Sequence, residues 1–414
     1  MIKKSYLLHT GALTLLLASC STTPQSGKQE GQIDIVPAFE NPTELKVSHL
    51  GKNIRYVPLE TNDSSLIGNS WSIRLLEDKI LVSCKEANLL FDRQTGKFLR
   101  KVSGMGQGPQ EYNSYIPFIH PETGDIYFNR TPKKMIRFNQ DGKFLGELAL
   151  PFEWNSGTYL TFDGKHALAP TSRYIYRFDA DAQINDSITL PLPGRDLDVN
   201  GIESVFSLVG KAAQMMGVGM FGVNGITAVR YKSRERMEII PSYYPSIYRL
   251  EGETCFHEAY NDTIFSIKGN QLSPRWVFNM GEYHFPRELY GNVKESLDRI
   301  VVTYATENER LLFFQCAKGW FAEGKLNVYN AIYNKKENTL LMNDKNEGFT
   351  DDLANFMPFH PEDFTPKGEY IGALNVWDIQ KWTEEHPDIK LEGALVPLKD
   401  LADDANPIAV IVEP

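Results

Sequence analysis

Three glycines at alternate positions, Gly104, Gly106 and Gly108, are the feature of this sequence nearest to a phosphate-binding loop. Such loops use closely spaced glycines because backbone N–H groups must approach the anion, and a helix follows directly. Here Pro109 and Glu111 follow instead, and the Glu111 carboxylate would place negative charge where a phosphate should lie. The pattern therefore favours a structural loop between two sheets over an anion-binding site.

Acidic and amide side chains gather between residues 179 and 186, and their oxygen atoms are of the kind that Ca²⁺ prefers. A calcium loop of the helix–loop–helix type needs glycine at its sixth position and glutamate at its twelfth. This chain has Ile184 and Leu190 there. A solvated hairpin turn is therefore the favoured interpretation of this segment.

Histidine and cysteine show no spacing typical of a metal site or of an activated nucleophile. The sequence contains no HExxH, H-x-H, C-x-x-C or G-x-S-x-G element, so no cofactor is predicted. A metal site would have to be assembled from distant segments. Besides Cys20, three further cysteines lie in apolar or aromatic neighbourhoods and are expected to be buried free thiols: Cys84, Cys255 and Cys316. One disulfide among them is the alternative.

Two aromatic pairs lie near expected turns, Tyr243 with Tyr244 and Trp320 with Phe321. Rings presented together could stack on the face of a sugar, which makes these four residues the candidate ligand-binding residues. Packing beneath loops or between sheets is the favoured alternative, because large aromatic side chains dominate core burial.

The first twenty residues read as an export signal. Lys3 and Lys4 precede an apolar run, residues 6–18, that would reach only ~20 Å as a helix and cannot span a hydrocarbon core of ~30 Å. The run ends in Leu17-Ala18-Ser19-Cys20, which resembles a bacterial lipobox with Cys20 as the lipidated residue. An ordinary signal with an accidental cysteine is the alternative. Acyl chains on Cys20 would hold the protein on a membrane.

We therefore predict a signal peptide over residues 1–19, a lipidated flexible tether over 20–35 and a folded part over 36–414. Residues 21–32 are small, polar and interrupted by Pro and Gly, as flexible linkers are. No acidic run follows Cys20, which favours the periplasmic side of the outer membrane over the cell surface. Loss of the leader would remove two lysines and change the net charge from −10 to −12, which argues against a nucleic-acid partner.

The remaining chain has the pattern of an all-β protein. Short runs rich in Val, Ile, Tyr, Phe and Leu alternate with polar turns, and three similar hairpins contain Phe91, Phe138 and Phe178. Gly96 and Gly142 supply the positive φ that two of these turns need. A period of about 40 to 50 residues with several strands is typical of a β-propeller, with a β-sandwich as the alternative. The 414 residues would make two or three domains by length alone, but the part that follows the leader and the tether is expected to form one ring.

A few helical inserts are expected between the strands. Pro286 can open a helix over 287–300, because a proline at the first helical position leaves no N–H unsatisfied. A second helix is expected over 376–385, ending before Pro387. A third insert over 205–222 carries Met215, Met216 and Met220; a helix packed on the propeller is favoured over a methionine-lined ligand groove.

Several segments in chain order resemble one family: Tyr56 to Thr61, Ser65 to Gly68, the Phe91 hairpin, and the motif formed by Gly106, Gly108, Pro109, Glu111 and Tyr112. Together they are similar to the uncharacterised six-bladed β-propeller lipoproteins of Gram-negative bacteria, which share the architecture of NHL-type propellers. The resemblance implies six four-stranded blades around a channel, a ring closed by strands from both chain ends, and a structural role for the five motif residues. It implies no established activity.

Two functional hypotheses follow. The first is a non-enzymatic binding or scaffold propeller, anchored to the outer membrane through Cys20, whose ligand is a glycan, a peptide or an envelope protein. The second is a propeller hydrolase or lyase with Ca²⁺ or another divalent ion held by carboxylates and histidines at the central channel, because such sites draw ligands from several blades. The first is favoured, since no catalytic constellation is visible; the oligomeric state stays open.

Overall fold

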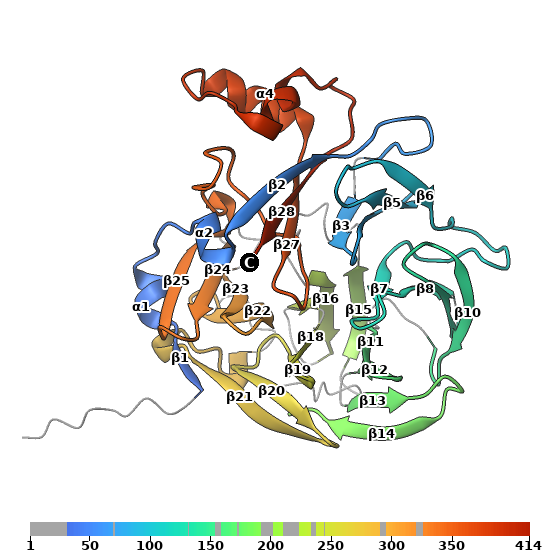
Figure 1. The fold of residues 1–414 in the computed structure, drawn as a ribbon. Coiled ribbons are helices and arrows are strands. Elements are labelled where there is room, and N and C mark those ends of the chain that lie inside the picture. Colours follow the sequence, from blue (N-terminus) through green and yellow to red (C-terminus); the bar gives the residue numbers. More distant parts are fainter. Residues whose placement is uncertain are drawn as a thin grey trace, which may run out of the picture.

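The computed structural model describes residues 31–414 with gaps at 69–70, 131, 154–158, 172–173, 192–201, 210–222, 233–236, 244, 290–294 and 320–325. Over these residues the chain forms a six-bladed β-propeller, as predicted (Figure 1). Each blade is a four-stranded antiparallel sheet that the chain builds from the central channel outward, in blades 1 to 5 without interruption.

The strands of the first three blades are short, and neighbouring strands are joined by tight turns. Blade 1 contains β3 (Trp71–Leu75), β4 (Lys79–Cys84), β5 (Asn88–Asp92) and β6 (Phe98–Lys101). Blade 2 contains β7 (Pro117–Ile119), β8 (Ile126–Arg130), β9 (Lys134–Phe138) and β10 (Phe144–Ala149). Blade 3 contains β11 (Thr161–Asp163), β12 (His166–Pro170), β13 (Tyr174–Phe178) and β14 (Ile184–Thr189).

The other three blades have longer strands or draw on the chain ends. Blade 4 contains β18 (Ser246–Leu250), β19 (Glu253–His257), β20 (Thr263–Lys268) and β21 (Gln271–Asn279). Blade 5 contains β22 (Ile300–Glu307), β23 (Leu311–Lys318), β24 (Asn327–Asn334) and β25 (Thr339–Asp344). Blade 6 contains β26 (Asp363–Phe364), β27 (Tyr370–Leu374), β28 (Ile408–Glu413) and, outermost, β2 (Asn53–Pro58).

The two ends of the chain close the ring in blade 6. β2 pairs antiparallel with β28 over its whole length, from Asn53 opposite Glu413 to Pro58 opposite Ile408. Strands that are remote in the sequence thus share one sheet, which removes the open edge that an unclosed ring would expose. The closure implied by the family resemblance is confirmed.

The three hairpins that suggested the repeat are the outer strand pairs of blades 1 to 3. Gly96 and Gly142 adopt the predicted positive φ, +70° and +73°, in the turns of blades 1 and 2. Ala182 adopts φ +59° in the corresponding turn of blade 3, where no glycine is present. The Asp-rich segment that resembled a calcium loop is this hairpin turn, in which the Asp179 carboxylate accepts hydrogen bonds from the N–H groups of Asp181 and Gln183.

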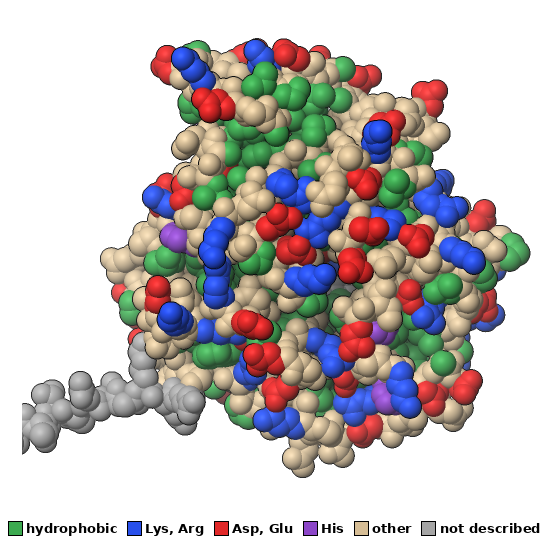
Figure 2. All heavy atoms as spheres, in the orientation of Figure 1, with side chains coloured by type: hydrophobic (Ala, Val, Ile, Leu, Met, Phe, Trp, Pro, Cys, Tyr) green, Lys and Arg blue, Asp and Glu red, His purple; other side chains and the backbone are tan. Residues whose placement is uncertain are grey.

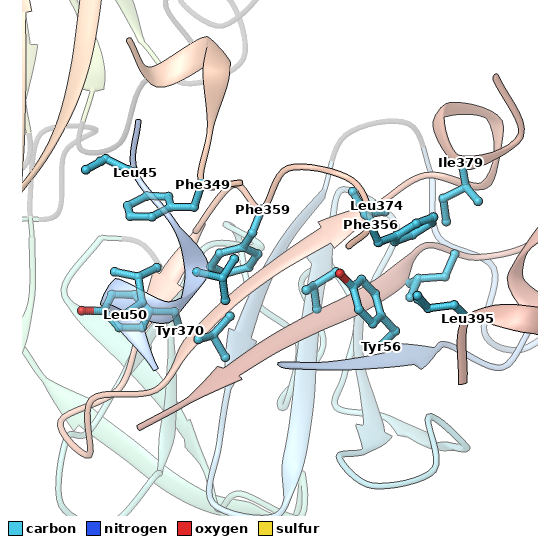
Figure 3. Close-up of a cluster of buried hydrophobic side chains, with 14 of the residues drawn as sticks. Leu45, Leu50, Tyr56, Phe349, Phe356, Phe359, Tyr370, Leu374, Ile379 and Leu395 are labelled. Carbon is cyan, nitrogen blue, oxygen red and sulfur yellow. The ribbon is translucent and has the colours of Figure 1, made fainter. Parts of the chain in front are cut away.

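Apolar side chains fill the spaces between neighbouring blades. Each of the described hydrophobic clusters lies between two consecutive blades, and together they follow the ring. The largest lies between blades 5 and 6 and extends outward under α4 (Val376–Glu385) (Figure 3). There the rings of Tyr56 and Phe356 meet edge to face at 5.4 Å, and Ile379 of α4 is fully buried. The predicted helix over 376–385 is thus confirmed, and it is held by the core.

The N-terminal segment runs along the outside of blades 4 to 6 before it enters the ring. β1 (Gln32–Asp34) adds a parallel fifth strand to blade 4 beside β21, and α1 (Val36–Glu40) buries Phe39 between blades 4 and 5. α2 (Val47–Leu50) then leads into β2. Since Ile33 and Ile35 are buried to within 1 % exposure, folded structure begins inside the range 20–35 that was expected to be tether.

Two predicted helical inserts were wrong over their described residues. The segment 205–222 begins as the end of a strand, β15 (Ile202–Val209), which pairs with β16 (Val223–Tyr231) and β17 (Met237–Tyr243) in an inserted three-stranded sheet. Residues Val205 to Val209 pair with β16, and this pairing makes the segment a strand. Among the described residues after Pro286, one 3₁₀ turn forms, Arg287–Leu289, and Ile300 is already the first residue of β22.

Candidate functional site

The central channel holds a cavity of about 460 Å³ to which the inner strands of all six blades contribute. Each inner strand runs in the same direction along the channel, so the turns that follow these strands gather at one end, here called the mouth. Figure 2 shows a face of the molecule on which acidic and basic side chains are mixed around the middle of the ring. A concave cavity with a few convergent polar groups is the usual form of a small-molecule site.

Four polar side chains from four different blades converge on this cavity: Arg74 (blade 1), Tyr159 (next to the inner strand of blade 3), Tyr304 (blade 5) and Asp363 (blade 6). We call them the channel waist. Each of the two tyrosines lies near enough to both Arg74 and Asp363 for their charges to influence the pKa of its hydroxyl. The channel waist is therefore one electrostatic unit assembled across the ring.

Strand alternation explains why Arg74 reaches the channel. Its neighbours Ile73 and Leu75 point into the core beside blade 1, so the side chain between them faces the other way. The Arg74 guanidinium Nη1 lies 4.0 Å from Asp363 Oδ1, and its Nε is buried with no hydrogen-bond partner among the described residues. Arg74 thus keeps donor capacity beside the cavity.

The acidic members of the channel have raised pKa values because the surrounding protein penalises their charge. Burial raises the pKa of Asp363, although Arg74 and the N–H groups of Phe364 and Leu75 partly oppose the shift. Burial and the neighbouring Asp363 charge raise the pKa of Glu362 to about 7. Carboxyl groups with perturbed pKa values in a cleft are typical of functional sites, which supports the channel as the candidate site.

The waist tyrosines stay protonated at neutral pH. Burial, followed by the charge of Asp363, raises the pKa of Tyr304 well above its ordinary value, and burial does the same for Tyr159. A neutral phenol can both donate and accept a hydrogen bond. The channel waist therefore presents one cation, one carboxyl group and two hydroxyls to the cavity.

Opposite charges at the mouth are paired with each other. Arg249 Nη1 lies 2.6 Å from Glu122 Oε1, which joins the turns of blades 4 and 2 across the opening. Lys367 Nζ lies 3.8 Å from Glu77 Oε1, and both of these side chains are about 70 % exposed. The exposed pair can rearrange at little energetic cost when a ligand passes, since exposed ion pairs contribute little.

His120 lines the cavity but is held by the backbone. Its Nδ1 accepts hydrogen bonds from the N–H groups of Glu122 and Thr123, so Nε2 carries the proton and donates to the carbonyl oxygen of Gly164 at 3.1 Å. Burial lowers the pKa of His120, and its ring stacks on Phe162 at 4.6 Å. His120 therefore joins blades 2 and 3 as a neutral side chain.

Metal-ligating side chains do not gather in the channel. Across the described ranges, no group of three or more His, Cys, Asp or Glu side chains is placed to hold a metal ion. Glu362 and Asp363 are adjacent in sequence, but they interact with different neighbours, Glu362 with Lys345 and Asp363 with Arg74. The donor set of the described channel suits hydrogen bonding better than metal coordination.

The glycine-rich motif forms the loop between β6 and β7, away from the cavity lining. The Glu111 carboxylate accepts a hydrogen bond from the N–H of Gly108 at 2.7 Å and lies against Gly106, where an added Cβ would stand 2.0 Å from its Oε2. The Arg130 guanidinium donates to the carbonyl oxygen of Pro109 at 2.6 Å. Glu111 thus occupies the place that a bound anion would need.

Tyr112 attaches this loop to the core between blades 1 and 2. Its ring is fully buried and stacks on Phe128 at 4.3 Å, and its hydroxyl accepts a hydrogen bond from Asn88 Nδ2 at 2.8 Å. The same Asn88 amide also donates to the carbonyl oxygen of Tyr115. The motif residues therefore connect two blades through one buried polar network.

Most of the predicted ligand-binding aromatics lie outside the described residues. Tyr244, Trp320 and Phe321 are among them, as is the predicted lipidation site Cys20. Tyr243 is the last residue of β17 in the inserted sheet, and of this residue only the backbone is described. The aromatic side chains that the structure places at the cavity are others, Tyr159 and Tyr304 foremost.

The three cysteines beyond Cys20 are free and buried, as was favoured. Cys84 lies in the cluster between blades 6 and 1, whereas Cys255 and Cys316 lie in the cluster between blades 4 and 5. Burial raises the pKa of the Cys255 thiol to about 11 and moves that of Cys316 further in the same direction. These thiols behave as apolar core side chains.

The channel waist was not found from the sequence. Its members are single residues from four blades, and none belongs to a local motif. The available signal was weak: a charged residue inside an otherwise apolar inner strand, as in Ile73-Arg74-Leu75, and two adjacent acids before the short strand at Asp363. Those positions could have been selected only after the inner strands had been assigned.

Comparison with protein families matches residues 30–413 to the family described as Domain of unknown function (DUF4934). No curated protein matches the chain. Within the described part of the chain, no helix is long and apolar enough to cross a membrane.

Among solved structures, a Bacteroides fragilis protein named for its expected export superposes with a TM-score of 0.58 at 16 % identity, over 93 % of this chain and 100 % of its own. A Bacteroides caccae protein of unknown function gives 0.38 at 12 % identity, over 67 % and 83 % of the two chains. BamB from Moraxella catarrhalis gives 0.34 at 10 % identity, over 70 % and 79 %. The first of these likenesses extends over nearly the whole propeller.

Proposed function

This chain belongs to the family described as Domain of unknown function (DUF4934), and we propose that it is a ligand-binding propeller of the bacterial cell envelope whose site is the central channel. The observation that carries this proposal is the channel cavity of about 460 Å³ with the channel waist at its wall. The cavity has the dimensions of a small-ligand site, whereas a protein partner would need an interface of ~1,000 Å² or more.

A binding role fits the chemistry of the channel better than hydrolysis or elimination at a metal. The side chains at the cavity include the Arg74–Asp363 pair and neutral tyrosines, which are groups that orient a ligand through hydrogen bonds. The alternative, a metal-dependent hydrolase or lyase, would need ligands beyond Glu362 and Asp363. Binding without turnover is therefore the function that this geometry supports best.

The envelope location rests on the leader and on Cys20. Lipidation of Cys20 would anchor the protein to the outer membrane, and we place the propeller on its periplasmic side. β1 begins at Gln32, and the carbonyl oxygen of Gly31 already accepts a hydrogen bond from the N–H of Val277, so we take residues 21–30 as the linker. Ten residues reach at most ~36 Å, so the propeller would stay close to the membrane surface.

Membrane fractionation of cells that express the wild-type protein and Cys20→Ala tests the anchor. The wild-type protein should fractionate with outer membranes, and Cys20→Ala should be released into the soluble fraction. Metabolic labelling with a palmitate analogue should mark only the wild-type protein. A Cys20→Ala variant that remains on the membrane would contradict the anchor and leave the channel proposal untouched.

Thermal-shift screening against saccharides, short peptides, amino acids and divalent ions tests the channel as the site. A ligand that binds only the native state raises the melting temperature, and the stabilisation grows with the logarithm of the ligand concentration above its Kd. The shift should disappear in Arg74→Gln/Asp363→Asn, which removes both waist charges together. It should persist in the matched control Glu77→Gln/Lys367→Gln at the exposed mouth pair. A ligand that stabilises both double variants equally would show that the channel is not the site.

A further inference from the structure

We infer that the ligand of the channel is a neutral saccharide of one or two rings, held at the channel waist by hydrogen bonds to its hydroxyl groups. This inference rests on the proposed function and names the ligand class for the same site. It is carried by four observations: the spacing of Arg74 and Asp363, the state of the two tyrosines, the balance of charge, and the apolar walls of the cavity.

The separation of the Arg74 and Asp363 side chains suits a bridging hydroxyl. Arg74 Nη1 and Asp363 Oδ1 are 4.0 Å apart, which is too long for a direct hydrogen bond. An oxygen that lies within hydrogen-bond distance of both can accept from the guanidinium and donate to the carboxylate. A hydroxyl group does both, whereas an ammonium group only donates and a carboxylate only accepts.

The two waist tyrosines also favour a ligand that carries hydroxyl groups. Tyr159 lies next to the inner strand of blade 3 and Tyr304 on the inner strand of blade 5, and burial keeps both hydroxyls protonated. The Tyr304 hydroxyl also interacts with Thr306, and a phenol has both donor and acceptor capacity, so these groups suit hydrogen bonding to ligand hydroxyls. A ligand with hydroxyls on several edges can use all four waist groups, which a small amine or carboxylate cannot.

The balance of charge at the cavity favours an uncharged ligand. Arg74 faces Asp363, Arg249 faces Glu122, and the exposed Lys367 faces Glu77. No single sign dominates these pairs. The lining also contains Glu369, which pairs with Arg93, and Glu362, whose pKa burial raises to about 7. A strongly cationic or anionic ligand would leave one member of the Arg74–Asp363 pair facing a like charge, whereas a neutral polyol would not.

Apolar side chains complete the cavity wall between the polar groups. Phe118 and Tyr159 meet edge to face at 5.7 Å, and Ile119 and Phe364 line the same space. The C–H faces of a sugar ring are apolar, so a saccharide buries them against such walls while its edges form hydrogen bonds. A metal ion or a free polar amino acid would gain little from these surfaces.

Calorimetric titration of the full mature chain tests the inference with defined probes: glucose, galactose, N-acetylglucosamine, maltose and cellobiose as neutral saccharides. Glucosamine and glucuronic acid serve as cationic and anionic analogues of the same ring, and glycine, ethanolamine and CaCl₂ represent the other ligand classes. At least one neutral saccharide should bind, and its charged analogue should bind more weakly by about tenfold or more.

Matched substitutions locate the binding. Tyr304→Phe removes one hydroxyl at the channel waist and should weaken saccharide binding about threefold to tenfold. Asp363→Asn should weaken it by about tenfold to a hundredfold, because a charged acceptor is lost. Tyr329→Phe makes the same change on another strand of blade 5, where the ring packs against Phe39, and should leave the affinity unchanged.

The outcomes separate this inference from the proposed function. Binding of glycine, ethanolamine or Ca²⁺, but of no neutral saccharide, with loss in Asp363→Asn would overturn the saccharide inference and leave the channel as the site. Saccharide binding that Tyr304→Phe and Asp363→Asn do not change would overturn both. Failure of every probe at millimolar concentration would also overturn both.

Discussion

Arg93 of blade 1 donates a hydrogen bond from Nη2 to Glu369 Oε1 of blade 6 at 2.5 Å, across the joint where the ring closes. The same Nη2 lies 3.2 Å from Glu413 Oε1, and Glu413 in turn pairs with Arg55 of β2 at 3.1 Å. The pairing of β2 with β28 is therefore reinforced by charges from the first blade, the last blade and both chain ends. The ring is thus closed by side-chain ion pairs as well as by the backbone pairing of β2 with β28.

Arg93→Met should weaken this joint, because the aliphatic part of the side chain is kept while Glu369 and Glu413 lose a common cation. The Arg93 side chain is 8 % exposed and Glu369 14 %, so we expect a loss of about 2–3 kcal/mol in the free energy of unfolding. Urea denaturation followed by tryptophan fluorescence measures it. Lys268→Met, which removes one side of an exposed pair, should change stability by less than about 1 kcal/mol. Equal effects of the two changes would show that Arg93 does not reinforce the closure.

Gly96→Ala tests the same joint through the backbone. Gly96 has φ +70°, and an added Cβ would stand 1.9 Å from the carbonyl oxygen of Pro58 in β2, so backbone has to move. Gly142 has nearly the same φ, +73°, but its Cβ would meet nothing nearer than 3.3 Å. Both variants place an alanine at a positive φ, which is unfavourable for a residue with a Cβ. Only Gly96→Ala also displaces β2, the strand that closes the ring.

We therefore expect Gly142→Ala to cost about 1 kcal/mol and Gly96→Ala at least twice as much, measured as the shift in the urea midpoint. Limited proteolysis provides a second readout, since loosening of β2 should expose the N-terminal segment to cleavage in Gly96→Ala alone. Similar midpoints for the two variants would mean that β2 adapts without strain.

Local patterns predicted the blades but could not predict the channel. The hairpins at Phe91 and Phe138 and the turn glycines between their strands are determined by residues a few positions apart, so the repeat was visible in the sequence. Arg74 and Asp363 meet only because the ring closes, and nothing near either residue indicates the other. The closure of the ring by both chain ends came from the family resemblance, and pairing of β28 with β2 confirms it.

The helical inserts show where local patterns mislead. Val376 to Glu385 became a helix because a buried face fits the cluster around Tyr56, whereas Val205 to Val209 became a strand because β16 pairs with it. Helix and strand preferences of such short apolar segments differ little, and tertiary pairing decides between them.

Glu307 provides a third prediction, at the contact of blades 4 and 5. Its side chain is fully buried, and it accepts hydrogen bonds from Arg275 Nε at 2.5 Å and from the Tyr248 hydroxyl at 3.0 Å, while Lys335 forms a further ion pair. Glu307→Gln would leave two cations beside an uncharged amide. Breaking a buried ion pair by removing one partner costs about 3–5 kcal/mol, and we expect a loss of this size.

Calorimetric melting of Glu307→Gln against Glu337→Gln measures the difference. Glu337 lies in the exposed turn of the neighbouring hairpin, so its replacement should leave the melting temperature nearly unchanged. A Glu307→Gln protein as stable as the control would mean that the two cations are solvated without their shared carboxylate.

Glu362 gives the channel a pH-dependent stability. Burial and the Asp363 charge raise the pKa of Glu362 from 4.5 to about 7, while the nearby Lys345 opposes the shift; His360 also faces Lys345. Between pH 4.5 and 7 the folded state therefore holds a proton that the unfolded state has released. The free energy of unfolding falls as pH rises through this window. Above pH 7 the loss of stability caused by ionising the buried Glu362 is complete.

Glu362→Gln removes this penalty, because the amide is neutral at every pH. We expect the variant to match the wild-type protein near pH 4.5 and to exceed its stability at pH 8 by about 1–3 kcal/mol. Water in the channel solvates the Glu362 carboxylate and so keeps the gain below the upper end of this range. Urea unfolding at both pH values measures the gain, and carboxyl NMR titration of Asp363→Asn should show a lowered pKa of Glu362, since a neighbouring negative charge is lost. A stability gain that is equal at pH 4.5 and pH 8 would show that Glu362 is charged throughout, and that the channel does not suppress its ionisation.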